Sequence, residues 1–71
     1  MRINEKILEK LADFEATTGV VPLAIYLGIE EIFLLKEWMH TTFGGAFDID
    51  DPELYGIKIY VVMRMNYLGV G

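Results

Sequence analysis

Hydrophobic and polar residues alternate with a helical period over the first eighteen positions. Apolar side chains recur three or four residues apart, at Ile7, Leu8, Leu11, Ala12 and Phe14. This spacing places them on one stripe of an α-helix, with the charged residues on the opposite, solvated side. We expect the helix to begin at Asn4, whose side chain suits an N-cap, and to end at Gly19.

A continuous apolar run follows over residues 20–27, bounded by glycines and rich in β-branched and aromatic residues. A run of this length and composition is typical of a strand that is covered on both faces. Pro22 lies within it and has no N–H for a ladder hydrogen bond. The regular strand is therefore expected to begin at Leu23 or to lie at a sheet edge.

Residues 29–41 predict a second helix whose polar side is narrow. Only three glutamates form that side, Glu30, Glu31 and Glu37. The apolar arc is wider than packing on one sheet requires, so we expect part of it to contact a second subunit. The residues predicted for that oligomer interface are Ile29, Ile32, Phe33, Leu35, Trp38 and Met39.

The segment 56–71 shows the clearest strand pattern in the chain. Apolar residues occupy one face, at Ile57, Ile59, Val61, Met63 and Met65, and Lys58, Tyr60 and Arg64 occupy the other. The segment is long for one strand, so a turn near Asn66 is expected to fold residues 67–70 back as a short third strand.

These elements predict a single α+β domain over residues 1–71, with two helices and a small two- or three-stranded sheet. A helix connects the two main strands, which permits a right-handed crossover and parallel pairing, while antiparallel pairing stays open. A sheet this narrow leaves edges exposed. We therefore expect the fold to be completed by oligomerisation.

Composition strengthens the case for a homo-oligomer. The chain has 71 residues, of which 54% are hydrophobic, and it has no cysteine. A domain of this size buries only about 60% of the surface that its unfolded chain exposes. Because disulfides are excluded, association with further copies is the expected way to cover the apolar excess.

Membrane insertion and secretion are not expected. The longest uncharged run, residues 16–29, is shorter than the roughly 20 residues that span a bilayer and contains two glycines and a proline. The first ten residues lack the continuous apolar core of a secretory signal. A cytoplasmic location is the expectation that follows.

The formal net charge is −5, which argues against direct binding to DNA or RNA. Mild acidity of this kind is common and serves solubility; an acidic surface that imitates nucleic-acid phosphates is the minor alternative role for the carboxylates.

A calcium loop is suggested by three acidic residues but is not completed. The run Asp48, Asp50 and Asp51 begins like that motif. Its fifth, sixth and twelfth positions should be an oxygen ligand, Gly and Glu, but in this chain they are Pro52, Glu53 and Ile59. A looser cation site formed by Asp48, Asp50 and Glu53 stays open beside a solvated loop, and we predict no metal centre.

Catalytic and cofactor motifs are also missing from the sequence. His40 is the one histidine, so a triad or a multi-histidine metal site would need several chains to meet. Gly44 and Gly45 are not followed by the Lys-Ser or Lys-Thr pair of a phosphate-binding loop. We expect no cofactor and no enzyme activity.

Lys58, Tyr60 and Arg64 are the candidate ligand-binding residues. Two cations and an aromatic ring on one strand face suit a small anionic ligand that can stack, such as a nucleotide. The alternative is that they simply form the polar face of a half-exposed strand, or pair with local carboxylates.

Two segments, PLAIYLGIEEIFLLKEW (22–38) and YGIKIYVV (55–62), resemble short uncharacterised proteins of tailed bacteriophages and prophages. The resemblance implies a class that includes minor virion components and small inhibitors of bacterial defence, among them oligomeric sponges that sequester cyclic-nucleotide signals. It carries no site residue onto this chain.

The sequence therefore predicts a non-enzymatic, homo-oligomeric binding protein that acts stoichiometrically. As a phage-encoded inhibitor in the host cytoplasm, it would cap a host protein or sequester a nucleotide-type signal. The alternative is a minor structural or assembly component of the virion.

Overall fold

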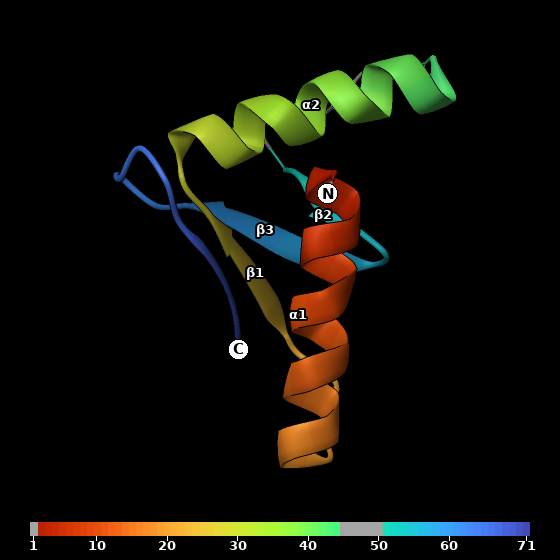
Figure 1. Ribbon diagram of the computed structural model, residues 1–71, viewed down its shortest axis with the longest axis vertical. Helices are drawn as coiled ribbons and strands as arrows, with labels where there is room; N and C mark the ends of the chain where they lie inside the picture. Colours follow the sequence, from red (N-terminus) through yellow and green to blue (C-terminus); the bar gives the residue numbers. More distant parts are fainter. Residues whose placement is uncertain (1, 45–50) are drawn as a thin grey trace.

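The computed structural model describes residues 2–44 and 51–71. Its elements are α1 (Ile3–Thr18), β1 (Ala24–Leu27), α2 (Ile29–Phe43), β2 (Glu53–Leu54), β3 (Ile57–Val61) and β4 (Leu68–Val70) (Figure 1). Two helices and a four-stranded mixed sheet confirm the predicted α+β class. The sheet is larger than predicted, because β2 forms from a pair of residues that have no strand pattern of their own.

The strand order is β2-β3-β1-β4, so β1 lies inside the sheet. β1 and β3 are parallel, with Ile25 opposite Ile59, and this pairing answers the question that the sequence left open. β4 runs antiparallel to β1, with Val70 opposite Ile25. Pro22 lies outside the ladder because β1 begins at Ala24.

Helix α1 begins two residues earlier than predicted. Its N-cap is Arg2, with Asn4 already inside the first turn, so the Asn4 cap prediction is wrong. Gly19 ends the helix as predicted: its φ of 76° is the left-handed conformation that glycine favours, and its N–H donates to the Glu15 carbonyl at 2.8 Å. The buried stripe is Ile3, Ile7 and Leu11.

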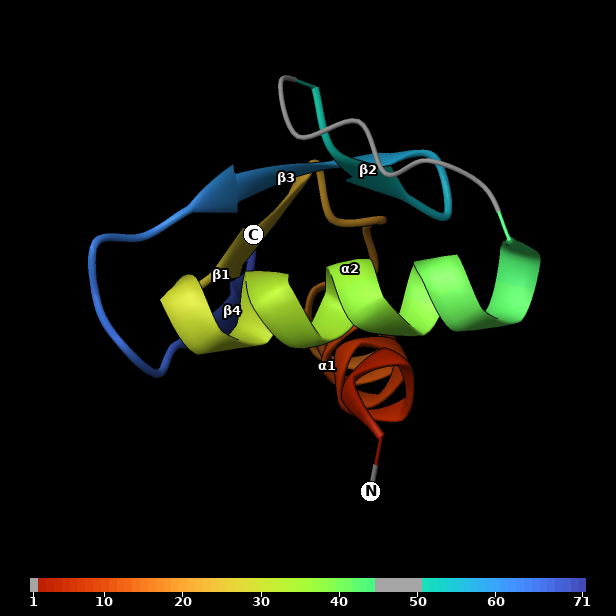
Figure 2. The same cartoon turned by 90° about the horizontal axis from the view of Figure 1, so that it is seen from above.

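Both helices pack on one face of the sheet, and Figure 2 shows α1 nearly end-on beneath α2. The core joins Ile7 and Leu11 of α1 with Ile25, Leu27 and Ile59 of the sheet and Leu35 of α2. Because side chains alternate across a strand, the residues between them face away from both helices. The prediction that β1 is covered on both faces is wrong, since Tyr26 is 38% exposed.

Leu35 corrects part of the predicted oligomer interface. Its side chain is fully buried within its own chain, between α2 and the rest of the core. Ile32, Trp38 and Met39 are partly buried against the same cluster. More of the apolar arc of α2 therefore packs into the chain's own core than the sequence predicted.

Within the part of the chain that the structure describes, neither helix has the length and hydropathy needed to cross a bilayer.

Candidate ligand-binding face

The sheet face that points away from the helices carries a pair of stacked tyrosines. Tyr26 of β1 lies opposite Tyr60 of β3 in the parallel ladder. Their ring centroids are 5.8 Å apart and the ring planes differ by 27°. Tyr60 is 51% exposed. The two rings therefore stack on one another and remain partly exposed to water.

A third tyrosine, Tyr67, lies next to β4. Gly69 is paired with Tyr26, and a Cβ added to Gly69 would lie 3.1 Å from Cε1 of Tyr67. The Tyr67 ring therefore lies over the glycine, in the space where a side chain would otherwise stand. Tyr67 itself precedes β4, which begins at Leu68.

Two cations flank these rings. The guanidinium carbon of Arg64 lies 5.8 Å from the centroid of the Tyr67 ring, a cation–π contact. Nζ of Lys58 lies 3.9 Å from Oδ1 of Asp51, and both side chains are well exposed, so this ion pair is weak. We call Tyr26, Tyr60, Tyr67, Lys58 and Arg64 the tyrosine face.

The three ligand-binding residues predicted from the sequence all belong to the tyrosine face, but they come from two different segments of the chain. Lys58 and Tyr60 lie on β3 and share its outward face, as the alternation indicated. Arg64 is not on the strand, because β3 ends at Val61 and a bend follows. Arg64 reaches the face from that bend through its contact with Tyr67. Sequence reasoning missed Tyr26 and Tyr67. Tyr67 stands two residues before Gly69, and residues two apart along a strand share a face, so this spacing is a signal that could have found Tyr67.

The bend over residues 62–67 is fixed by the first residues of α2. The N–H groups of Gly28, Ile29 and Glu30 donate to the carbonyl oxygens of Tyr67, Arg64 and Met65 at 2.9, 2.8 and 3.0 Å. A helix start leaves such N–H groups without partners inside the helix. Here carbonyl oxygens of the bend accept these hydrogen bonds, and the same bonds fix the backbone of the bend.

Carboxylates of α2 complete this contact. Glu31 Oε1 accepts a hydrogen bond from the Tyr67 N–H at 2.9 Å. The Asn66 amide donates to Glu30 at 2.6 Å and to Glu31 at 3.2 Å. Partial burial raises the pKa of Glu31, but the hydrogen bonds from Tyr67 and Asn66 together outweigh it and leave the pKa below its ordinary value.

The outer side of α2 is a second exposed feature. Of the residues predicted for an oligomer interface, Ile29 and Phe33 are exposed, at 44% and 67%. Phe43 is equally exposed and was not predicted; its ring meets Trp38 edge-on at 5.5 Å. A hollow of about 280 Å³ is lined by Phe33, Lys36, Glu37 and His40.

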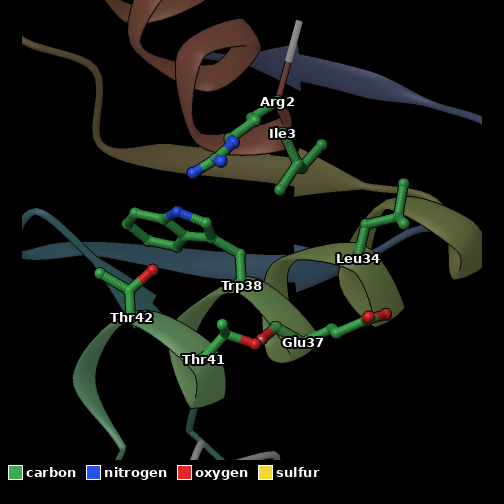
Figure 3. A pocket seen from close by; sticks show the side chains of 7 residues that line it. All are labelled: Arg2, Ile3, Leu34, Glu37, Trp38, Thr41 and Thr42. Carbon is green, nitrogen blue, oxygen red and sulfur yellow. Dashed lines mark hydrogen bonds between the residues drawn. The ribbon is translucent and has the colours of Figure 1, made fainter.

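An open pocket of about 350 Å³ lies between the start of α1 and α2. It is lined by Arg2, Ile3, Leu34, Glu37, Trp38, Thr41 and Thr42. In Figure 3 the Arg2 guanidinium and the Trp38 indole point toward one another. The Thr41 hydroxyl donates to the backbone carbonyl oxygen of Glu37 at 2.9 Å, and Arg2 and Glu37 bring charged side chains to the wall.

No set of three or more potential metal ligands comes together in residues 2–44 and 51–71. Of the loose cation site, Glu53 lies on β2, while Asp48 and Asp50 fall outside the described residues. His40 lies exposed in the last turn of α2, where a partial positive charge is favourable.

Comparison with protein-family models, with curated proteins and with solved structures gives no match to this chain. The resemblance to proteins of tailed phages therefore stays a prediction from the two segments quoted above.

Proposed function

We propose that the protein is a small non-enzymatic binding protein that works as a homo-oligomer and takes an anionic ligand with a planar ring, of the nucleotide class, on the tyrosine face. The observation that carries this proposal is the exposed Tyr26–Tyr60 stack on an uncovered sheet face, with the Arg64–Tyr67 pair beside it.

The chemistry of these side chains suits such a ligand. Stacking of a base on an aromatic side chain contributes about 1–3 kcal/mol, and it tolerates any base because each has a flat face. A guanidinium next to the rings offers paired donors to phosphate oxygens. The net charge of −5 disfavours a long polyanion, which supports a small ligand over a nucleic-acid strand.

Exposed apolar side chains support the homo-oligomeric part. On α2, Ile29, Phe33 and Phe43 are 44%, 67% and 67% exposed. Association would remove part of this surface from water.

A phage-encoded inhibitor of host defence is the biological setting that the sequence resemblance implies, with the host cytoplasm as its place of action. A virion assembly component is the second candidate, and the exposed apolar side of α2 favours it. The two candidates differ in what they predict for the tyrosine face. The first predicts that it binds a ligand, and the second predicts that it does not.

Calorimetric titration with mononucleotides and cyclic dinucleotides tests the proposal. We expect at least one of them to bind, with affinity reduced tenfold or more in Tyr60→Ala and in Arg64→Ala. Tyr55→Ala is the matched control, because Tyr55 is also 51% exposed but lies in the turn before β3. If the unmodified protein binds none of these nucleotides, the proposed ligand class is wrong. If Tyr55→Ala loses as much affinity as Tyr60→Ala and Arg64→Ala, the proposed location of the site is wrong.

A further inference from the structure

Arg64 is a cation without a carboxylate partner in an acidic chain. Acidic residues number 11 and basic residues 6. Within residues 2–44 and 51–71, however, no carboxylate lies at ion-pair distance from the Arg64 guanidinium, and the ion pair found there joins Lys58 to Asp51. The guanidinium lies instead over the Tyr67 ring, 5.8 Å from its centroid. Its N–H donors therefore stay available for an added anion.

Lys58, the other cation of the tyrosine face, has acidic neighbours. Its Nζ lies 3.9 Å from Oδ1 of Asp51, and Glu53 is its register partner on β2. Residues directly opposite one another in an antiparallel pair point to the same face of the sheet. Two carboxylates beside one ammonium repel an incoming phosphate. A phosphate on this face is therefore attracted to Arg64 more than to Lys58.

The carboxylates that contact the bend itself are Glu30 and Glu31. The Asn66 amide donates to both of them, and the Tyr67 N–H donates to Glu31. The positive charge of Lys6 on α1 also acts on Glu31. These donors and Lys6 stabilise the two carboxylates on the helix-covered side of the sheet, away from the tyrosine face.

The Tyr67 ring and the Arg64 backbone are both held in place. The Tyr67 N–H donates to Glu31, and the Arg64 carbonyl oxygen accepts from the Ile29 N–H at 2.8 Å. The ring lies over Gly69, where an added Cβ would stand 3.1 Å from Cε1 and 3.3 Å from Oη of Tyr67. The fold therefore presents the guanidinium at a defined place beside the tyrosine rings.

We propose that Arg64 is the phosphate subsite of the tyrosine face and that Tyr67 is the positioning residue that holds its guanidinium there. The planar ring of the ligand then stacks on the Tyr26–Tyr60 pair while the phosphate binds to Arg64. This inference rests on the proposed function and adds to it: the discrimination between a nucleotide and its nucleoside resides in Arg64 and Tyr67.

Calorimetric titration of the four mononucleotides, each compared with the nucleoside of the same base, tests the subsite. We expect Arg64→Ala to lower nucleotide affinity about tenfold or more, the typical effect of losing hydrogen bonds to a charged group, and to leave nucleoside affinity unchanged. Lys10→Ala removes the same charge from α1 and serves as the control. Lys58→Ala should lose less than Arg64→Ala, and an equal loss in the two variants would overturn the location of the phosphate.

Tyr67 variants test the positioning role. Tyr67→Leu should lower nucleotide affinity about threefold or more, in keeping with the loss of an exposed cation–π contact, whereas Tyr67→Phe keeps the ring and should retain the affinity. Nucleoside affinity separates positioning from folding, because a misfolded variant loses both ligands. An equal loss of nucleotide and nucleoside in Tyr67→Leu, or no loss of nucleotide, contradicts the positioning role.

The unmodified protein separates this inference from the proposed function. If it binds nucleotides no more tightly than their nucleosides, the phosphate subsite is wrong and the tyrosine face stands. If it binds neither, the proposed function fails and the subsite fails with it.

Discussion

The backbone N–H of Tyr67 donates a hydrogen bond to the carboxylate of Glu31, with 2.9 Å between nitrogen and oxygen. This bond joins the residue just before β4 to the first turn of α2. The same bend carries Arg64, whose guanidinium lies over the Tyr67 ring. The geometry of the tyrosine face therefore depends on a helix that lies on the other side of the sheet.

Glu31→Ala should destabilise the fold by about 1 kcal/mol, because it removes two hydrogen bonds to a charged group at a partly exposed position. Glu31→Gln keeps an acceptor oxygen and should lose less. Urea denaturation monitored by circular dichroism measures both. Glu9→Ala, an exposed glutamate on α1, serves as the control and should lie within about 0.5 kcal/mol of the unmodified protein. A Glu31→Ala protein as stable as this control would show that the contact contributes nothing.

The contribution of Glu31 should depend on pH in a defined direction. Burial raises its pKa, the hydrogen bonds from Tyr67 and Asn66 lower it, and the net pKa lies below the ordinary value of 4.5. A carboxyl with a lowered folded pKa stabilises the fold above its unfolded pKa and loses that contribution as pH falls through the folded pKa.

We therefore expect the difference in unfolding free energy between the unmodified protein and Glu31→Gln to stay constant from neutral pH down to about 5 and to shrink below about 4.5. Urea titrations at a series of pH values measure this difference. A difference that grows as the pH falls would contradict the assignment.

Gly28→Ala should be among the most damaging single-methyl additions in the chain. A Cβ at Gly28 would lie 2.7 Å from Glu31 Oε1, 2.7 Å from the Tyr67 nitrogen and 2.8 Å from the Arg64 carbonyl oxygen. Two of these atoms belong to the backbone and cannot simply rotate away. We expect a loss of about 2 kcal/mol or more in unfolding free energy, in the range of strongly overpacked positions.

Gly71→Ala is the matched control for that substitution. Its added Cβ would meet only Tyr26 Cε2, at an ordinary contact distance of 3.9 Å. Its unfolding free energy should equal that of the unmodified protein. Equal stability of the Gly28 and Gly71 variants would contradict the close approach of α2 to the bend.

Local patterns account for the parts of the fold that the sequence predicted. The helical period of α1, its end at Gly19 and the alternation within β3 are properties of neighbouring residues and were confirmed. Two details were wrong: Leu8 of the predicted stripe is 45% exposed, and the strand ends at Val61, before Met63 and Met65. The outward direction of Lys58 and Tyr60 follows from the same alternation.

Contacts between distant segments account for the parts that were missed. Glu30 and Glu31 have the sequence pattern of a solvated polar side, yet they bind a bend 35 and 36 residues away. Leu35 has the same pattern as its exposed neighbours on α2, and its burial follows from where the sheet and α1 lie. Tyr26 joined the candidate site only because β1 and β3 are parallel neighbours.

Nuclear magnetic resonance titration with mononucleotides and cyclic dinucleotides tests the central claim most directly, because it reports each residue separately. The account predicts chemical-shift changes at Tyr26, Tyr60, Arg64 and Tyr67, with Tyr55 unaffected. A ligand whose shift changes cluster on the outer side of α2, or the absence of changes with every nucleotide, would contradict the claim that the tyrosine face is the binding surface.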